Sequence, residues 1–244
     1  MKRVALLGFC LLAAGCGSHP ASLVVHRVQR HCTAGIVPLG SARLAYAAVA
    51  RGSLSADARP GGRVLSRFGK QNVNGVPTIF GVRAERANAS CAATWFRVQL
   101  PIKPNGIVGW VRARDVEIGS VATRIVIDES QRRLTLYRDG VPTLTTTVAV
   151  GSPATPTPTG SFYVNQRLLP ENPNGPYGPA AIGVSAYSNV LTGWAQGGPI
   201  AIHGTDDPAS IGRAVSNGCV RVRNEVVLRL FHQVLAGTPV IIRP

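Results

Sequence analysis

The sequence is short of charged, acidic and aromatic residues. Charged residues make up 15% and aromatic residues 6% of the 244 positions, and Asp and Glu number 11 against 26 Lys and Arg. Hydrophobic residues make up 45%, which excludes a disordered or strongly solvated chain. The sequence also has no GxGxxG or Walker loop and no CxxC pair, so it lacks these common marks of nucleotide and metal sites.

Long helical runs and collagen-like repeats are missing as well. The 27 glycines and 18 prolines are scattered without a period, which excludes collagen and long helical bundles. Short strands joined by many turns fit this composition better. A chain of this length forms one or two domains, and we expect a mainly β fold.

The positive charge is large but has no focus. The formal net charge is +15, yet no Lys/Arg-rich block is interleaved with aromatic residues. Nucleic acid is therefore a poor candidate partner. A basic surface fits a protein held electrostatically near the anionic polymers and lipid headgroups of a cell envelope.

The N-terminus has the pattern of a secretory signal peptide. Lys2 and Arg3 precede an apolar stretch of about 11 residues over 4–14, too short to span a bilayer. We expect export to a periplasmic or cell-wall space. Small residues directly before Cys16 resemble a bacterial lipobox, so Cys16 is the expected lipidation site and membrane anchor. The alternative is ordinary cleavage near Gly17.

Cysteine parity leaves one thiol over. Cys10 leaves with the signal and Cys16 would carry lipid, while Cys32 and Cys91 can pair in an oxidising exterior. Cys219 is then alone. An exposed lone thiol oxidises readily, so Cys219 is either buried and inert or a working nucleophile.

The chain divides into a tether and two units. Residues 17–43 lack sustained periodicity and are the expected tether. Residues 44–119 show predicted strands at 46–50, 64–68, 78–82, 95–100 and 109–111. WFRVQLP at 95–101, the turn at 104–106 and GWV at 109–111 resemble the bacterial Src-homology-type small barrel of cell-wall proteins. That resemblance implies a docking or spacer role; a generic small β domain is the alternative.

The second unit covers residues 122–244 and is also mainly β. Residues 124–128 and 133–137 alternate with period two, Asp139-Gly140 predicts a hairpin turn, and alternation returns over 144–150. Pro142 places that strand at an edge or starts it after the turn. A helix is expected over 225–236, capped by Asn224 and stopped by Gly237, before a closing strand at 240–242.

One cluster in this unit can carry chemistry. An apolar strand ends in His203, and Cys219 follows sixteen residues later. An imidazole can take the thiol proton, and the resulting thiolate is the nucleophile. Arg221 and Arg223 are expected to lower the thiol pKa. Spacing alone leaves open a buried, inert Cys beside a core His.

Several stretches together resemble the YkuD-type L,D-transpeptidases. HGT at 203–205 and SNGCVR at 216–221 are similar to the family pattern of His, a gap and Ser/Thr-x-Gly-Cys-x-Arg. VAVGSPATPTPTGSF at 148–162 resembles its edge strand and Pro-Thr-Gly turn. Residues 175–191 resemble the approach to its catalytic strand. The resemblance covers about 120 residues, and it implies a β-rich YkuD-type catalytic domain.

The resemblance implies a defined set of catalytic roles. Cys219 attacks the carbonyl between the third and fourth residues of a peptidoglycan stem tetrapeptide and releases D-alanine. His203 is the general base and later the acid, and the Gly204 carbonyl orients it. Backbone amides at Asn217, Gly218 and Cys219 stabilise the oxyanion. The thioester then passes to an amine of a neighbouring stem, and carbapenem β-lactams are expected inhibitors.

Other residues have weaker assignments. Arg221 orders the loop or meets a substrate carboxylate, and Ser216 is either structural or part of substrate binding. Tyr187 is a candidate for the substrate groove, as are Tyr177 and Trp194, with core packing as the alternative for each.

The sequence departs from the family pattern at one position, and a metal site is the alternative interpretation of the cluster. Asn217 stands where many relatives have a second histidine, which puts any proton shuttling at this position in doubt. Asp206 and Asp207 beside His203 do not complete a tetrahedral ligand set with the distant Cys219, so no metal and no cofactor are expected.

Three functions compete at this point. The first is an L,D-transpeptidase that makes cross-links. The second is a thiol L,D-carboxypeptidase or other cysteine peptidase that gives the acyl group to water. The third is a non-catalytic wall-binding lipoprotein with an unreactive Cys219. His203 precedes Cys219, which argues against the cell-wall endopeptidases whose Cys comes before their His.

Overall fold

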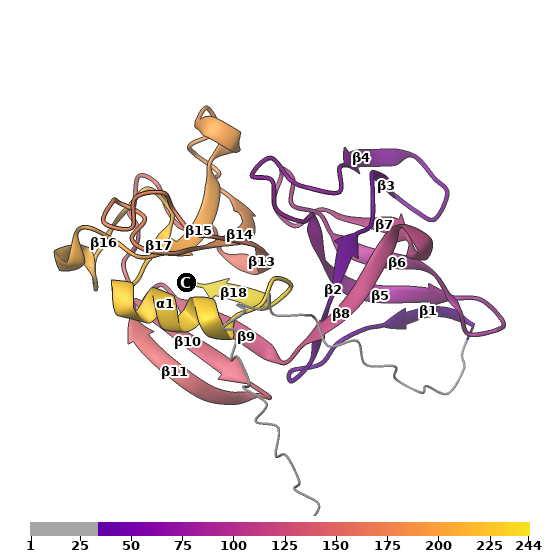
Figure 1. The fold of residues 1–244 in the computed structure, drawn as a ribbon, viewed down its shortest axis with the longest axis horizontal. Coiled ribbons are helices and arrows are strands. Elements are labelled where there is room, and N and C mark those ends of the chain that lie inside the picture. The colour runs from indigo at the N-terminus through magenta and orange to yellow at the C-terminus, as the bar shows by residue number, and fades with distance from the viewer. Residues whose placement is uncertain (1–33) are drawn as a thin grey trace, which may run out of the picture.

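The protein is mainly β and has two lobes, each built around its own sheet (Figure 1). The computed structural model describes residues 34–244. Cys16 and Cys32 lie outside the described residues, so lipidation and the Cys32–Cys91 pairing stay predictions. Cys91 itself is disulfide-bonded, while Cys219 is free.

The first lobe is an eight-stranded sheet in the order β4-β3-β7-β6-β5-β2-β8, with β1 added on β5. Closure into the expected small barrel stays a prediction. The elements are β1 (Gly35–Pro38), β2 (Ala45–Ala50), β3 (Leu54–Asp57), β4 (Val64–Phe68), β5 (Ile79–Ala87), β6 (Ala93–Gln99), β7 (Val108–Arg112), a single-turn 3₁₀ helix η1 (Ala113–Asp115) and β8 (Val116–Val121).

All five strands predicted for this lobe are present, although β5 is longer than expected. The tether expected over residues 17–43 needs a correction at its end. Residues 35–38 form β1, which pairs antiparallel with β5. The alternation in this four-residue strand is too short to stand out in the sequence, and pairing with β5 stabilises it.

The second lobe holds a second eight-stranded sheet, in the order β11-β10-β9-β18-β13-β14-β15-β17, and a separate pair β12-β16. Its elements are β9 (Thr123–Asp128), β10 (Arg133–Arg138), β11 (Val141–Thr147), β12 (Val150–Gly151), β13 (Gly160–Leu168), β14 (Ala181–Tyr187), η2 (Ala195–Gly197), β15 (Pro199–His203), η3 (Pro208–Ser210), β16 (Ala214–Ser216), β17 (Val220–Arg221), α1 (Asn224–Gln233) and β18 (Pro239–Arg243).

Local chemistry explains the order of this sheet. Asp139 and Gly140 both have positive φ and turn β10 back into β11, as the hairpin pattern predicts. Pro142 lies in β11, the edge strand of the sheet, where proline is tolerated better than in a central strand. The closing strand β18 lies in the interior of the sheet, parallel to β9 and antiparallel to β13.

The helix α1 covers this sheet with one apolar face. Val227 and Leu230 are fully buried in the core of the lobe. The predicted cap is wrong: Asn224 is the first helical residue, and Arg223 at the N-cap makes no side-chain cap. The Asn224 side chain accepts a hydrogen bond from the backbone N–H of Thr205 at 2.7 Å instead. Its role therefore belongs to the site described below.

The two lobes dock through buried polar contacts beside β5 and β13. Tyr163 is 2% exposed and donates its hydroxyl to the Ile79 carbonyl at 3.0 Å. Gln99 donates to the Ser161 carbonyl at 2.8 Å. A Cβ at Gly81 would come within 2.8 Å of the Tyr163 ring, so glycine is needed for this close approach. The lobes are thus joined by specific hydrogen bonds as well as apolar contact.

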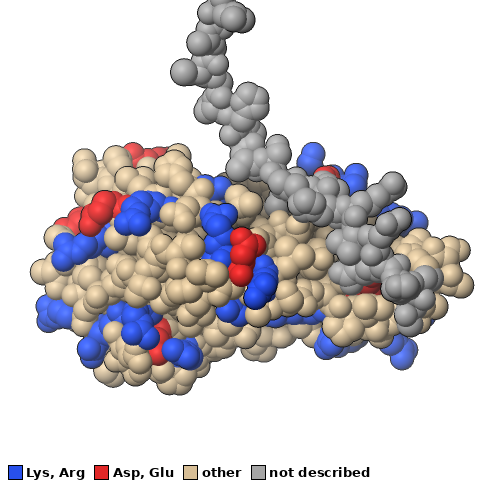
Figure 2. All heavy atoms as spheres, turned by 90° about the horizontal axis from the view of Figure 1, so that it is seen from below, with Lys and Arg blue, Asp and Glu red and all other residues tan. Residues whose placement is uncertain are grey.

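One face of the molecule shows how the charged side chains are distributed. On the face drawn in Figure 2, Lys and Arg side chains are spread over both lobes, with a few acidic groups among them. No helix within residues 34–244 has the length and apolar character to cross a membrane.

Candidate active site

The strands β15 and β17 bring the histidine and the cysteine to one face of the sheet. They run parallel, with Ile202 beside Val220 and His203 beside Arg221. One position earlier, Ala201 therefore lies beside Cys219. Residues two apart on a strand share a face, so extending this alternation to Cys219, which directly precedes β17, puts the His203 and Cys219 side chains on the same side as diagonal neighbours, roughly 8 Å apart at the backbone.

His203 is held as a neutral base. Its side chain is 4% exposed, and its Nδ1 lies 2.5 Å from the Gly204 carbonyl oxygen. A carbonyl only accepts, so Nδ1 carries the proton and Nε2 is left with a free lone pair. Burial lowers the pKa of His203 from 6.5 to about 4; Arg221 also lowers it, while the Gly204 contact and Asp206 oppose the shift. The imidazole is therefore uncharged at neutral pH and able to accept a proton.

Glycine at position 204 is required by close packing. A Cβ there would lie 2.3 Å from Oδ1 of Asn224 and 3.0 Å from Cα of Gly178. The Gly204 backbone N–H also bonds to the Ala180 carbonyl. Asn224 thus fixes the segment that orients His203. Sequence reasoning missed this function because a polar residue before an amphipathic helix is also the signal for a cap.

The thiol of Cys219 is half-buried and lies between backbone groups of β15. Its Sγ is 3.9 Å from the Pro199 carbonyl oxygen. Burial raises the pKa of Cys219, and this effect exceeds the lowering by a backbone hydrogen bond from Ala201 and by the Arg221 charge. From the sequence we expect Arg221 and Arg223 to lower the pKa of the thiol. This expectation is wrong, because desolvation raises the pKa by more than Arg221 lowers it. The resting pair is a neutral thiol beside a neutral imidazole.

The loop before Cys219 is shaped by Ser216 and Gly218. Gly218 has φ +109°, a conformation that favours glycine, and its N–H donates to Ser216 Oγ at 3.1 Å. Ser216 is 1% exposed and donates to the Cys219 carbonyl at 2.5 Å. Ser216 is therefore structural, not a substrate contact, and the Gly218 amide is already engaged. Within the described part of the chain, the N–H groups of Asn217 and Cys219 have no partner and remain available as oxyanion donors.

Arg221 holds the neighbouring loops together. Its backbone N–H and carbonyl pair with Ala149 at 3.0 and 2.9 Å. Its guanidinium lies 3.9 Å from the Asp207 carboxylate, a partly exposed pair that contributes little energy but restricts the loop after Gly204. Of the two roles expected for Arg221, the structure shows loop ordering.

An open hollow of about 620 Å³ lies over the thiol. Cys219, Asn217 and Ala201 line it, and the half-exposed Tyr177 and Trp194 form part of its rim. The Tyr177 ring also packs edge-on against the His203 ring, with centroids 5.0 Å apart.

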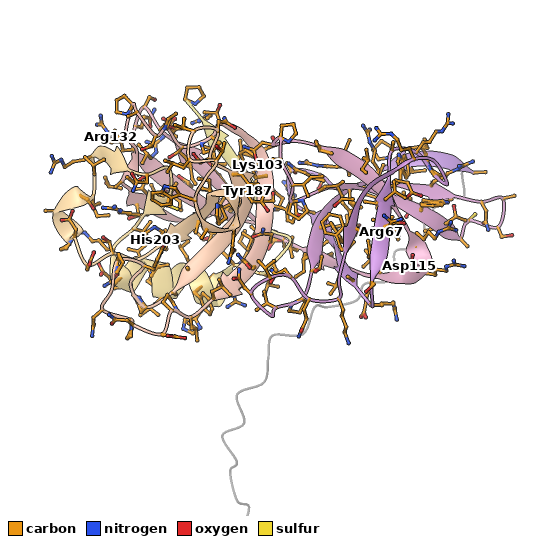
Figure 3. All side chains as sticks on the ribbon, turned by 90° about the horizontal axis from the view of Figure 1, so that it is seen from above. Arg67, Lys103, Asp115, Arg132, Tyr187 and His203 are labelled. Carbon is orange, nitrogen blue, oxygen red and sulfur yellow. The ribbon has the colours of Figure 1, made fainter. Side chains whose placement is uncertain are left out.

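Tyr187, the third aromatic candidate, points elsewhere. It lies outside this lining, and its hydroxyl donates to Pro101 of the first lobe at 2.8 Å. Figure 3 shows Tyr187 and Lys103 together at the junction of the lobes, away from His203. The assignment of Tyr187 to the groove over Cys219 is therefore corrected. Within residues 34–244, His, Cys, Asp and Glu nowhere gather in a group of three that could hold a metal ion.

Comparison with known proteins identifies the family to which the second lobe is similar. The family model of the YkuD L,D-transpeptidase catalytic domain matches residues 122–242. The Bacillus subtilis protein named as L,D-transpeptidase YkuD is 39% identical over 123 residues, which cover 50% of this chain and 67% of that protein. The chain belongs to the YkuD L,D-transpeptidase family. A Bacillus licheniformis relative with the same name is 39% identical over 125 residues, covering 51% of this chain and 68% of that protein.

Two solved structures of L,D-transpeptidases are similar to part of the chain. An Enterococcus faecium L,D-transpeptidase is 28% identical with a TM-score of 0.37, and the match covers 50% of this chain and 49% of that one. The protein thus spans about half the length of that enzyme. Mycobacterium tuberculosis L,D-transpeptidase 3, solved with a faropenem-derived adduct, is 20% identical with a TM-score of 0.41, covering 56% and 73%.

Proposed function

We propose that the protein is an exported, lipid-anchored peptidoglycan L,D-transpeptidase with Cys219 as its nucleophile. The observation that carries this proposal is the β15–β17 register, which puts the neutral imidazole of His203 and the half-buried thiol of Cys219 at diagonally neighbouring positions, with an open hollow lined by Cys219. Family membership supports acyl transfer as the reaction class. The signal-like N-terminus supports export to the envelope, where such a substrate is found.

The acylation step follows from the protonation states. His203 Nε2 takes the thiol proton as Sγ bonds to the carbonyl carbon between the third and fourth residues of a stem tetrapeptide. The oxyanion accepts hydrogen bonds from the N–H groups of Cys219 and Asn217. The C–N bond then breaks, His203 gives its proton to the leaving nitrogen, and D-alanine departs. Because both groups rest neutral, proton transfer accompanies attack.

Transfer to a second stem restores the enzyme. An amine of a neighbouring stem attacks the thioester carbonyl, the C–S bond breaks, and the proton lost by the amine returns through His203 to the sulfur. A cross-link is formed. The same thiol would open the strained ring of a carbapenem, so stable acylation of Cys219 is expected as inhibition.

Mass spectrometry of muropeptides tests the proposal. The purified protein is incubated with disaccharide-tetrapeptides, and a cross-linked dimer that has lost one D-alanine is expected. The Cys219→Ala variant should give no dimer. A tripeptide monomer as the main product would instead assign an L,D-carboxypeptidase, and an unchanged substrate would leave the non-catalytic reading.

A further inference from the structure

The hollow over Cys219 continues into a second hollow between the lobes. The second hollow, which we call the interlobe cleft, has a volume of about 340 Å³, within the range of about 300–1,000 Å³ common for small-molecule sites. Both hollows are lined by Asn74, Gln166, Gln196 and Pro199. A ligand bound at the thiol can therefore extend into the cleft and stay in contact with the protein, because the two hollows share these lining residues.

A ladder of side-chain amides forms the boundary between the two hollows. Gln196 donates to Asn74 Oδ1 at 3.0 Å, and Asn74 donates to Gln166 Oε1 at 2.9 Å. Asn72 donates to the same oxygen of Gln166 at 2.8 Å. The ladder joins β13 and η2 of the second lobe to the loop before β5 of the first. It makes the first lobe a wall of the extended groove.

Several polar groups of the cleft take no part in the hydrogen bonds of this ladder. Asn165 Oδ1 is fully buried and has no hydrogen-bond partner within residues 34–244. Asn165 also lines the cleft, and a turn of its side chain that brings Oδ1 to the cleft surface would let a ligand donor satisfy this costly acceptor. In the same range, the Gln71 side chain and the Nε2 group of Gln166 have no partner either. The cleft thus offers both an acceptor and donors.

The remaining lining determines which ligand fits. Phe68 and Tyr187 give the cleft aromatic surface, while amides supply most of its polar groups. Arg67 is its only Lys, Arg, Asp or Glu, and it is exposed and placed in the first lobe (Figure 3). Lys103 lies outside the lining, with Nζ 5.8 Å from the centroid of the Tyr187 ring. Within the lining itself, a strongly anionic ligand would meet no cation other than Arg67. A neutral ligand with hydroxyl and acetamido groups and an apolar ring face matches both surfaces.

We propose that the interlobe cleft is a glycan subsite that binds N-acetylated amino sugars of the strand carrying the stem at Cys219. This inference rests on the proposed function, because it takes the stem in the first hollow as the reference. The stem is covalently joined to its sugar, so a groove that continues past the peptide site is where that sugar would lie. The first lobe then contributes directly to substrate binding.

Direct binding tests the subsite independently of catalysis. The probe is chitotetraose, an uncharged tetramer of N-acetylglucosamine, titrated into the purified full chain and followed by calorimetry. We expect measurable binding that weakens at least fivefold in Asn165→Leu and in Gln71→Ala. Asn165→Leu removes the unpartnered acceptor at similar volume, and Gln71 is exposed, so both variants should fold. Asn174→Leu, an exposed position outside both linings, should bind like the wild type.

Kinetics separates this inference from the proposed function. For a sugar-free tetrapeptide, Asn165→Leu should release D-alanine at the wild-type rate, while for a disaccharide-tetrapeptide its KM should rise at least fivefold. If the KM of Asn165→Leu changed equally for both substrates, the subsite would be overturned. It would also be overturned if both cleft variants bound chitotetraose with the affinity of the wild type. Absence of chitotetraose binding to the wild type would overturn it too. Failure of the proposed function would appear separately, as no D-alanine release with chitotetraose binding intact.

Discussion

The two lobes are both sheets with apolar cores, but they use their buried polar groups differently. In the first lobe, the buried polar side chains are scattered. One of them, Gln99, donates a hydrogen bond to the second lobe. In the second lobe, His203, Thr205, Ser210 and Ser216 are all buried around the ends of β15 and β17. Most buried polar groups in proteins are hydrogen-bonded, and each of these four side chains bonds to a backbone group of the loops around the thiol.

This difference predicts where substitutions act. Changes near β15 and β17 should remove chemistry, because each group there sets the position or protonation of another. Changes in the first lobe should alter only docking and substrate binding. The largest effect should therefore come from the imidazole, and the smallest from a polar contact at the junction.

Replacing the base gives the largest expected effect. His203→Gln should lower the rate of D-alanine release by about 10²–10⁴-fold, the usual contribution of a positioned acid–base group. His232→Gln, an exposed histidine on α1, is the matched control and should keep the wild-type rate. Release is measured under saturating tetrapeptide. A rate within threefold of the wild type in His203→Gln would show that another group takes the thiol proton.

The same imidazole should make stability depend on pH. The folded pKa of His203 is about 4, against 6.5 for an ordinary histidine. Between these values the unfolded chain binds a proton that the folded chain does not, so stability is retained above pH 6.5 and lost as pH falls toward 4. A shift of this size corresponds to roughly 3 kcal/mol. Urea unfolding across this window should show that loss in the wild type, and a flat difference between wild type and His203→Gln would contradict it.

Crowding around Gly204 gives the next effect. Gly204→Ala should destabilise the protein by about 1–3 kcal/mol, because the new methyl group meets Asn224 and the Gly178 backbone. It should also displace the carbonyl that orients His203, so activity falls as well. Gly193→Ala is the control, since nothing lies within 4 Å of a Cβ there. Thermal unfolding of both variants measures the difference; equal midpoints would show that the segment adapts.

Sequence patterns predicted the strands better than the site's electrostatics. Period-two alternation and the Asp139-Gly140 turn are local, so β9, β10 and their hairpin could be placed from the residues alone. The pairing of Cys219 with His203 could be proposed from residue types and a family resemblance. The sign of the thiol pKa could not, because it depends on how much water the fold removes from Cys219.

Residues whose roles depend on distant contacts were the ones misassigned. Asn224 carries a cap pattern, yet its side chain reaches the segment after His203. Tyr187 lies near the groove residues in sequence, but its hydroxyl and backbone bond to the first lobe. Gly218 and Ser216 both fit an active-site loop, and the hydrogen bond between them is visible only in the folded structure. Each case needed a long-range or loop geometry that no local pattern encodes.

The junction contact of Asn105 gives the smallest expected effect and the sharpest view of how the lobes cooperate. Asn105 Nδ2 donates to the Tyr187 carbonyl at 2.8 Å, and its Oδ1 accepts from the Tyr187 N–H at 2.9 Å. Asn105→Ala should cost about 1–2 kcal/mol, because two part-buried backbone groups lose their partners. Tyr187 starts the loop that leads to Trp194 on the rim of the hollow, so KM should rise while the rate at saturation stays within about twofold. Asn174→Ala is the control for both measurements. A fall in kcat with KM unchanged would mean that the first lobe supports the chemistry at Cys219 itself, and the division of labour between the lobes would then have to be withdrawn.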